Sequence, residues 1–387
     1  MFFPTRPHYF SHRINQEVKE IYWNAMVVNL ALSITTLFEP IFLYRLGYSL
    51  SGILHFYALV YLGYAILVFL AAKITSRIGY KHSILVSNIF YVLYWVLLYQ
   101  IKFHPILFFI APFFFSLQKS FFWPPYHADI ALNAKDDQRG REVGLLFSLI
   151  QMVSVAGPLV GGFIAAFLGF KELFILSSVL MLASVYPLFR SAEIYPKHNF
   201  RFRNFLLVIR KFPVNFFAYW GYAEDLMLMS LWPVYIFLVV PELLGVGFLI
   251  TVASAIAIMI MLYIGRVIDQ RKWGKFLQIS SVFYGLTWFC RQFGSGFGQV
   301  FFFDSLTRTG KAMINVPMTA LSYKLAGISG ADQAIAYTVF YEFSLSIGKI
   351  LTALLGIWIL DTTGNIFYVF IVAGIFTMFY GFLKEKK

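Results

Sequence analysis

The sequence predicts an all-α membrane protein in which twelve transmembrane helices form two pseudo-symmetric six-helix bundles. Sixty per cent of the 387 residues are hydrophobic and only 13% are charged, whereas soluble domains carry about 25% charged residues. The pattern Lys-x5-Pro-x2-Ala occurs at 119–128 and again 192 residues later at 311–320. A repeat of about half the chain in a membrane protein indicates two related halves that face each other.

Twelve apolar segments fit the length of the chain, because one membrane crossing needs about 20 apolar residues. All twelve should be helices, since lipid gives backbone groups no other hydrogen-bond partner. Pro40 in the first segment has a counterpart in Pro233 of the seventh, close to the same period. The expected segments are 21–44, 53–76, 83–101, 105–125, 144–168, 170–190, 212–240, 244–267, 276–296, 299–322, 334–360 and 365–383.

The polar stretch 191–211 divides the chain. It mixes basic residues with Phe and Leu, a composition typical of a short amphipathic helix on a membrane face. We therefore expect an N-terminal six-helix bundle at 1–190, a cytoplasmic linker at 191–211 and a C-terminal six-helix bundle at 212–387. Residues 1–20 contain no apolar signal region, so the first crossing is expected to act as its own insertion signal.

The basic charge predicts orientation rather than nucleic-acid binding. The net charge is +13, and 23 of the 31 Lys and Arg residues fall in loops and tails that share one side. The positive-inside rule makes that side cytoplasmic. We expect a multi-pass protein of the cell (inner or plasma) membrane, with both termini in the cytoplasm and lipid contacts at the basic loops. Arg291 is assigned to an outer loop, and Cys290 has no second cysteine to pair with.

The loop after the second segment carries a recognisable motif. It reads Ala72-x3-Ser76-Arg77-x-Gly79-x-Lys81, which resembles the Gly-x3-Asp-Arg-x-Gly-Arg-Lys motif of the major facilitator superfamily. The second half keeps the two positions that the first half lacks, Gly265 and Asp269, followed by Arg271. The resemblance implies that Arg77, Gly79, Lys81, Gly265, Asp269 and Arg271 form a cytoplasmic gate, with charges that only set the orientation of the chain as the alternative.

The fifth segment contains Gly157-Pro158-x2-Gly161-Gly162. This resembles the core of a motif found in drug/proton antiporters of the same superfamily, although Val153 replaces a glycine that usually precedes it. Glycines permit close helix approach, and the proline removes one backbone hydrogen bond. The four residues are therefore expected to form a helix-packing motif between the halves, with plain helix packing as the alternative.

Ionisable residues within membrane segments are costly, and each is a functional candidate. Asp225 and Glu224 lie near the middle of the seventh segment, and Glu39 lies beside Pro40. These three are the candidate proton-coupling residues. Adjacent helical residues point about 100° apart, so we expect only one of Glu224 and Asp225 to face a cavity.

Lys119 and Lys311 are related by the repeat and should approach the same level from opposite halves. Two ammonium groups would attract an anion unless carboxylates balance them. Asp304 and Arg308 share a helix face at i,i+4 spacing and would neutralise each other. The expected substrate-cavity residues are Lys119, Lys311, Arg308, Asp304, Glu342, Lys349, Tyr222 and Trp220.

The sequence therefore predicts a secondary active transporter that moves a small organic solute by alternating access. Proton-coupled efflux is the expected activity, and a symporter or exchanger of an organic anion is the alternative. A non-transporting membrane sensor or a lipid scramblase is an alternative of another class. No phosphate loop, dinucleotide fingerprint or metal cluster is evident. We expect no enzyme activity, cofactor, metal or nucleic-acid partner, and a monomer that interacts with solute, protons and lipids.

Overall fold

The computed structural model describes residues 16–133, 139–190, 193, 195, 200–267, 273–328 and 331–384, and none of these residues lies in a β-strand. The first half contains α1 (Gln16–Thr35), α2 (Glu39–Arg45), α3 (Leu50–Ile78), α4 (Tyr80–Gln100), α5 (Leu107–Asn133), α6 (Arg139–Phe167), α7 (Phe170–Ala183) and the 3-10 helix η1 (Tyr186–Arg190). The second half contains α8 (Phe202–Lys211), α9 (Pro213–Ala218), η2 (Tyr219–Ala223), α10 (Glu224–Met229), α11 (Leu231–Val239), α12 (Leu243–Val267), α13 (Trp273–Cys290), η4 (Arg291–Phe293), α14 (Phe297–Ile328), α15 (Ala331–Thr363), α16 (Ile366–Thr377) and η5 (Met378–Phe382).

These elements form twelve crossings within the described ranges. Five crossings are composite: α1 with α2, α7 with η1, α9 through α11, α13 with η4, and α16 with η5. Eight stretches of the described chain are long and apolar enough to span a membrane by themselves. The other four crossings are α5, α13, α14 and the run from α16 into η5. The predicted twelve-helix fold class is confirmed.

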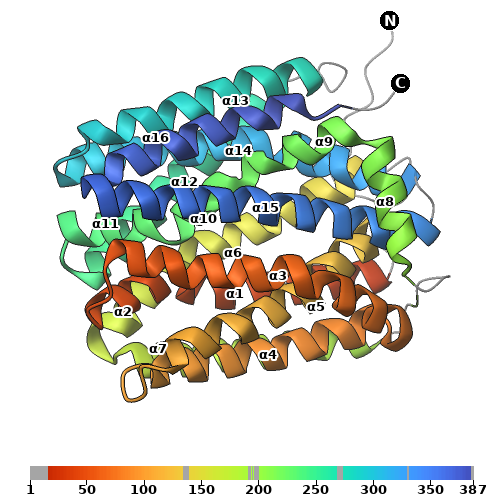
Figure 1. The fold of residues 1–387 in the computed structure, drawn as a ribbon, viewed down its shortest axis with the longest axis horizontal. Helices are drawn as coiled ribbons and strands as arrows, with labels where there is room; N and C mark the ends of the chain where they lie inside the picture. The colour runs from red at the N-terminus through yellow and green to blue at the C-terminus, as the bar shows by residue number, and fades with distance from the viewer. Residues whose placement is uncertain are drawn as a thin grey trace, which may run out of the picture.

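The two halves lie side by side along their full length. In Figure 1 the red and orange helices of the first half fill the lower part, and the green to blue helices of the second half fill the upper part. α3 packs against α15 at the front of this view, and α6 packs against α12 behind them. α8 and α9 lie at one end of the molecule, and α2 and α11 lie at the other. The contact surface between the halves therefore contains four long helices.

The first and seventh crossings are interrupted, although the sequence analysis treated 21–44 and 212–240 as continuous segments. α1 ends at Thr35 and α2 begins just before Pro40. In the seventh crossing, Ser230 separates α10 from α11, with Pro233 near the start of α11. Proline has no backbone N–H and clashes with the carbonyl four residues earlier, so it breaks the helix on its N-terminal side. The two breaks follow from prolines at equivalent places in the repeat.

The glycines of α6 pack closely against helices of both halves. A Cβ at Gly161 would overlap the Ile34 carbonyl oxygen of α1, and one at Gly162 would lie 2.7 Å from the Leu243 carbonyl oxygen of α12. Gly157 faces Ser33 on α1 in the same way. The backbone N–H of Leu159, beside Pro158, donates to Thr251 Oγ1 on α12 at 3.1 Å. In the structure α6 thus packs between α1 and α12, with Gly161 against one and Gly162 against the other.

The division of the chain at 191–211 stays a prediction. Within that stretch the structure describes α8 and residues 193, 195, 200 and 201. Phe205 of α8 is buried, and its ring lies 4.9 Å from the Phe69 ring of α3 and 5.4 Å from the Phe343 ring of α15. α8 therefore touches both halves at one end of the bundle, while its basic side chains remain exposed.

Candidate functional site

A cavity of about 340 Å³ lies between the two halves. This is the size of a typical small-molecule site. The first half contributes residues from α1, α3, α4, α5 and α6, and the second half contributes residues from η2, α10, α14 and α15. The charged and histidine residues of its lining are Lys119, His127, Asp225, Lys311, Glu342 and Lys349. The cavity therefore brings together six ionisable groups from opposite halves.

An acid–base cluster forms the second-half wall of the cavity. Lys311 Nζ lies 2.5 Å from Asp225 Oδ1 and also pairs with Glu224 Oε1. Lys349 Nζ lies 3.7 Å from Asp225 Oδ2 and donates to the Tyr61 hydroxyl at 3.2 Å. The Asp225 carboxylate is thus held between two ammonium groups, and Lys349 joins it to α3 of the other half.

Glu224 and Asp225 are neighbours with different surroundings. The Glu224 side chain is 0% exposed and Asp225 is 24% exposed. The hydroxyls of Tyr284 and Tyr380 donate to Glu224 at 2.8 and 3.0 Å, and Lys311 supplies a third donor. Only Asp225 of the two lines the cavity. Glu224 ties α10 to α13, α14 and η5, while Asp225 presents a carboxylate oxygen to the site.

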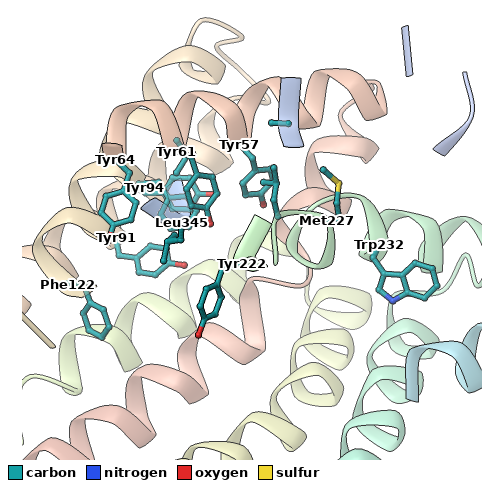
Figure 2. Packing of buried hydrophobic residues seen from close by; sticks show 14 of the residues in the cluster. Tyr57, Tyr61, Tyr64, Tyr91, Tyr94, Phe122, Tyr222, Met227, Trp232 and Leu345 are labelled. Carbon is teal, nitrogen blue, oxygen red and sulfur yellow. The ribbon is translucent and has the colours of Figure 1, made fainter. Parts of the chain in front are cut away.

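The first-half wall is aromatic and carries one isolated cation. Lys119 Nζ lies 4.5 Å from the Phe115 ring centroid and 5.3 Å from that of Tyr61. No carboxylate in the described part of the chain lies within ion-pair distance of it. Figure 2 shows the phenol rings of Tyr61, Tyr64 and Tyr91 gathered on this side, and Tyr222 of the second half lines the same cavity. Lys119 is therefore stabilised by cation–π contacts in place of an ion pair.

His127 is a cavity residue that the sequence analysis did not single out. Its Nε2 lies 3.1 Å from Glu342 Oε1, and its Nδ1 lies 2.8 Å from the Tyr323 hydroxyl. The ring also stacks on Trp123 with the centroids 5.4 Å apart. These contacts join α5 to α14 and α15 at the base of the cavity. The available signal was its position two residues after Pro125, within the repeated motif.

Several predicted site residues lie outside this cavity. Glu39 is fully buried and accepts hydrogen bonds from the Tyr94 hydroxyl at 2.9 Å and Trp95 Nε1 at 2.7 Å. Trp220 does not line the cavity, because its ring packs among Phe216, Phe217 and the aromatic side chains of α16 and η5. Asp304 is fully buried, and Arg308 faces a separate cavity. Trp220, Asp304 and Arg308 were expected in the substrate cavity, but none of them lines the cavity between the halves.

Asp304 instead belongs to a buried cluster that includes Arg291. Arg308 Nε donates to Asp304 at 2.5 Å, so the predicted i,i+4 pair is present. Trp232 Nε1 donates to the other carboxylate oxygen at 2.7 Å. The Arg291 guanidinium lies between the Trp232 and Trp288 rings, 3.7 and 3.9 Å from their centroids, and is 0% exposed. Assigning Arg291 to an outer loop was wrong, because the two indole rings and Asp304 enclose its charge.

A Tyr-x3-Trp pair that occurs in both halves marks the helices that bind the buried acids Glu39 and Glu224. Tyr91-x3-Trp95 on α4 returns 193 residues later as Tyr284-x3-Trp288 on α13. In the first half Trp95 donates to the acid Glu39, and in the second half Tyr284 donates to the acid Glu224. The offset equals that between Pro40 and Pro233, so the repeat extends further than the lysine motif indicated.

The predicted gate residues are placed in part. Gly79 ends α3 with φ of +93°, a conformation that favours glycine. The Glu193 carboxylate accepts from the backbone N–H groups of Lys81 and His82 at 2.9 and 3.0 Å, and Lys81 Nζ lies 3.5 Å from Glu20. Arg77 is exposed. Gly265 lies in α12, while Asp269 and Arg271 fall outside the described residues.

Comparisons with known proteins agree with this architecture. Residues 21–290 match the family model described as Major Facilitator Superfamily. Multidrug resistance protein 2 of Bacillus subtilis (strain 168) is 24% identical over 339 residues, which are 82% of this chain and 82% of that protein. A crystal structure of the E. coli fucose:proton symporter FucP is similar with a TM-score of 0.66 at 12% identity, covering 94% of this chain and 97% of that one. At this identity, the likeness to FucP shows a common fold.

Proposed function

The chain belongs to the major facilitator superfamily of multi-pass membrane transporters, and we propose that it is a proton-coupled secondary transporter that exports a small organic solute by alternating access. The observation that carries this proposal is Asp225, a partly exposed carboxylate at the interface of the halves that two lysines hold. A charged side chain within a membrane segment costs free energy, so such residues mark functional sites. Asp225 is therefore the proposed proton carrier.

The ion pairs around Asp225 give a physical route to coupling. Protonation of Asp225 removes the charge that Lys311 and Lys349 bind, and it frees Lys349 from its position between Asp225 and Tyr61. The Tyr61 contact crosses from the second half to the first, so the same proton weakens a link between the halves. Glu224, Lys119, His127 and Glu342 are the other ionisable groups near or on the cavity.

The aromatic wall and the relative support export of an apolar or amphipathic solute. Tyr61, Tyr64, Tyr91 and Phe115 supply flat apolar surface beside a few charges, a combination that suits organic solutes. The similar Bacillus protein is named as a multidrug resistance protein. The proposed location is the cell membrane, with both termini and α8 on the cytoplasmic side, and the working unit is a monomer.

The test uses purified protein in liposomes with ethidium as the probe and an imposed pH gradient. Ethidium movement that depends on the gradient, and that Asp225→Asn abolishes, supports the proposal. Glu242→Gln, at an exposed position between α11 and α12, is the matched control and should transport normally. Lipid flipping without a gradient would instead identify a scramblase. Tight ethidium binding without flux would identify a sensor.

A second candidate function is transport of an organic anion, and the observation that favours it is Lys119. This cation faces the cavity, and none of the described carboxylates pairs with it, so a solute carboxylate would neutralise its charge. Uptake of fluorescein by the same liposomes tests it. Loss of fluorescein uptake in Lys119→Gln with ethidium transport intact would favour the anion transporter. Intact fluorescein uptake in Lys119→Gln would exclude the proposal that Lys119 binds a transported anion.

A further inference from the structure

A second cavity of about 230 Å³ lies beside the first. It is bounded by α1, α6, α10, α12 and α14, and it shares Thr36 and Met229 with the main cavity. Its lining differs in chemistry, because it contains no tyrosine and no carboxylate. Arg308 is the one charged side chain among the residues that line it. The two neighbouring cavities therefore offer a ligand different side chains: tyrosines, acids and lysines in the first, and Arg308 with uncharged groups in the second.

Three uncharged donors surround Arg308 in this second cavity. Gln151 and Ser154 lie one turn apart on α6, and Ser254 lies on α12. Within the described chain, none of these three side chains has a protein hydrogen-bond partner. An amide N–H and two hydroxyls are thus available on two walls, while Arg308 reaches in from α14. Such an arrangement suits a ligand that accepts hydrogen bonds from several directions.

The charge balance behind Arg308 leaves the second cavity positive. Asp304 neutralises one guanidinium only, yet both Arg308 at 2.5 Å and Arg291 at 3.9 Å are directed at it. Asp304 is 0% exposed, whereas 29% of the Arg308 side chain is exposed toward the cavity. Two cations and one anion leave a net charge of about +1 in a region of low dielectric, where an uncompensated charge is costly.

We propose that the second cavity binds a small monovalent anion, a halide or a carboxylate, between Arg308, Gln151, Ser154 and Ser254. A free anion would neutralise the Arg291–Asp304–Arg308 cluster. A carboxylate of the transported solute would neutralise the same cluster. It would enter the second cavity between Thr36 and Met229, while the rest of the solute stays in the main cavity. Both sources use the same donors, and charge-assisted hydrogen bonds to Arg308 would supply most of the affinity.

The test measures the melting temperature of the purified protein in detergent, and it needs no transport, so it can fail independently of the proposed function. Sodium gluconate is replaced stepwise by sodium chloride or sodium formate at constant ionic strength. A ligand that binds only the folded state raises the melting temperature. Saturable stabilisation by chloride indicates a free halide, and stabilisation by formate alone indicates a solute carboxylate.

Variants locate the anion. Arg308→Gln should abolish the stabilisation, and Ser154→Ala with Ser254→Ala should raise the half-saturating concentration by about thirtyfold, as expected for two lost hydrogen bonds. Lys119→Gln, in the main cavity, should retain the stabilisation. If Arg308→Gln does not fold, Gln151→Leu tests the same cavity without touching the ion pair. Stabilisation that survives in both Arg308→Gln and Gln151→Leu, that is lost only in Lys119→Gln, or that is absent in the unmodified protein would overturn the proposal.

Discussion

Lys119 on α5 and Lys311 on α14 hold equivalent places in the repeat and face the same cavity, but their partners differ. Lys119 lies against the rings of Phe115 and Tyr61. Lys311 is bound by the carboxylates of Glu224 and Asp225. The first half thus offers an aromatic wall on which Lys119 has no ion-pair partner among the residues that the structure describes, and the second half offers an acid–base network. The duplication kept the positions of the lysines and changed the groups around them.

The largest expected effect comes from removing the two lysines in turn. Lys311→Met leaves the buried Glu224 carboxylate and the partly exposed Asp225 carboxylate without their shared cation, and it should lower the free energy of unfolding by about 3–5 kcal/mol. Lys119→Met loses only cation–π contacts, which contribute about 1 kcal/mol. Unfolding in SDS, followed by circular dichroism, measures both. Equal losses for the two variants would contradict the division between the halves.

The next comparison lies within the network, between neighbouring acids. Asp225→Asn should remove the pH dependence of ethidium transport and abolish gradient-driven flux, because the proposed proton carrier is lost. Its melting temperature should fall less than that of Glu224→Gln, because the Asp225 side chain is 24% exposed, although Lys349 loses its carboxylate partner.

Glu224→Gln is the matched variant for that test. It should lower the melting temperature clearly, since Tyr284, Tyr380 and Lys311 all donate to a fully buried carboxylate. Its pH dependence, where enough protein folds to measure it, should persist. The opposite pattern, with coupling lost in Glu224→Gln and kept in Asp225→Asn, would move the proton site to Glu224.

A smaller effect is expected where the halves touch through α6. Gly161→Ala would push a methyl group into α1 within the first half and should cost about 1–3 kcal/mol of stability. Gly162→Ala would meet α12 of the second half at 2.7 Å and should slow transport more than it lowers stability. Gly274→Ala is the control, because nothing lies within 4 Å of its added Cβ. Equal transport rates for Gly162→Ala and Gly274→Ala would show that the contact between Gly162 and α12 serves helix packing and has no role in transport.

The smallest expected effect concerns the loop after α3, where Glu193 binds the first backbone N–H groups of α4. Glu193→Gln should cost about 1 kcal/mol, as for other helix caps. Hydrogen exchange at the amides of Lys81 and His82 should quicken, while Glu242→Gln leaves it unchanged. Unaltered exchange in Glu193→Gln would show that the cap does not hold this loop.

The sequence analysis predicted the helical architecture, but it predicted only some of the residues that line the cavity. The crossings, the charge asymmetry and the repeat are local or periodic signals, so they can be read without a structure. The placement of Lys119, Lys311, Glu342, Lys349, Asp225 and Tyr222 on one cavity agrees with expectation, though their roles stay predictions. Trp220, Asp304 and Arg308 were misplaced because membrane depth alone does not give the direction of a side chain.

The residues that were overlooked share one property: their partners are far away in the chain. His127 meets Tyr323 and Glu342, Arg291 meets Trp232, and Glu193 meets the start of α4. A lone histidine or a loop arginine carries no periodic signal. The matching Tyr-x3-Trp pairs on α4 and α13 were visible in the sequence, yet their link to buried acids required the packed structure.

The amino-acid sequence by itself determined that the chain crosses a membrane in two related halves. Hydrophobic composition, loop charge and the Lys-x5-Pro-x2-Ala repeat act through lipid solvation and helix geometry, which depend on residues close in sequence. Only the tertiary structure decided that Lys311 is neutralised by carboxylates and that Lys119, at the equivalent position, lies against aromatic rings. That choice depends on carboxylates and rings contributed by other helices, because pairing energies in a low-dielectric interior depend on distances that the sequence does not contain.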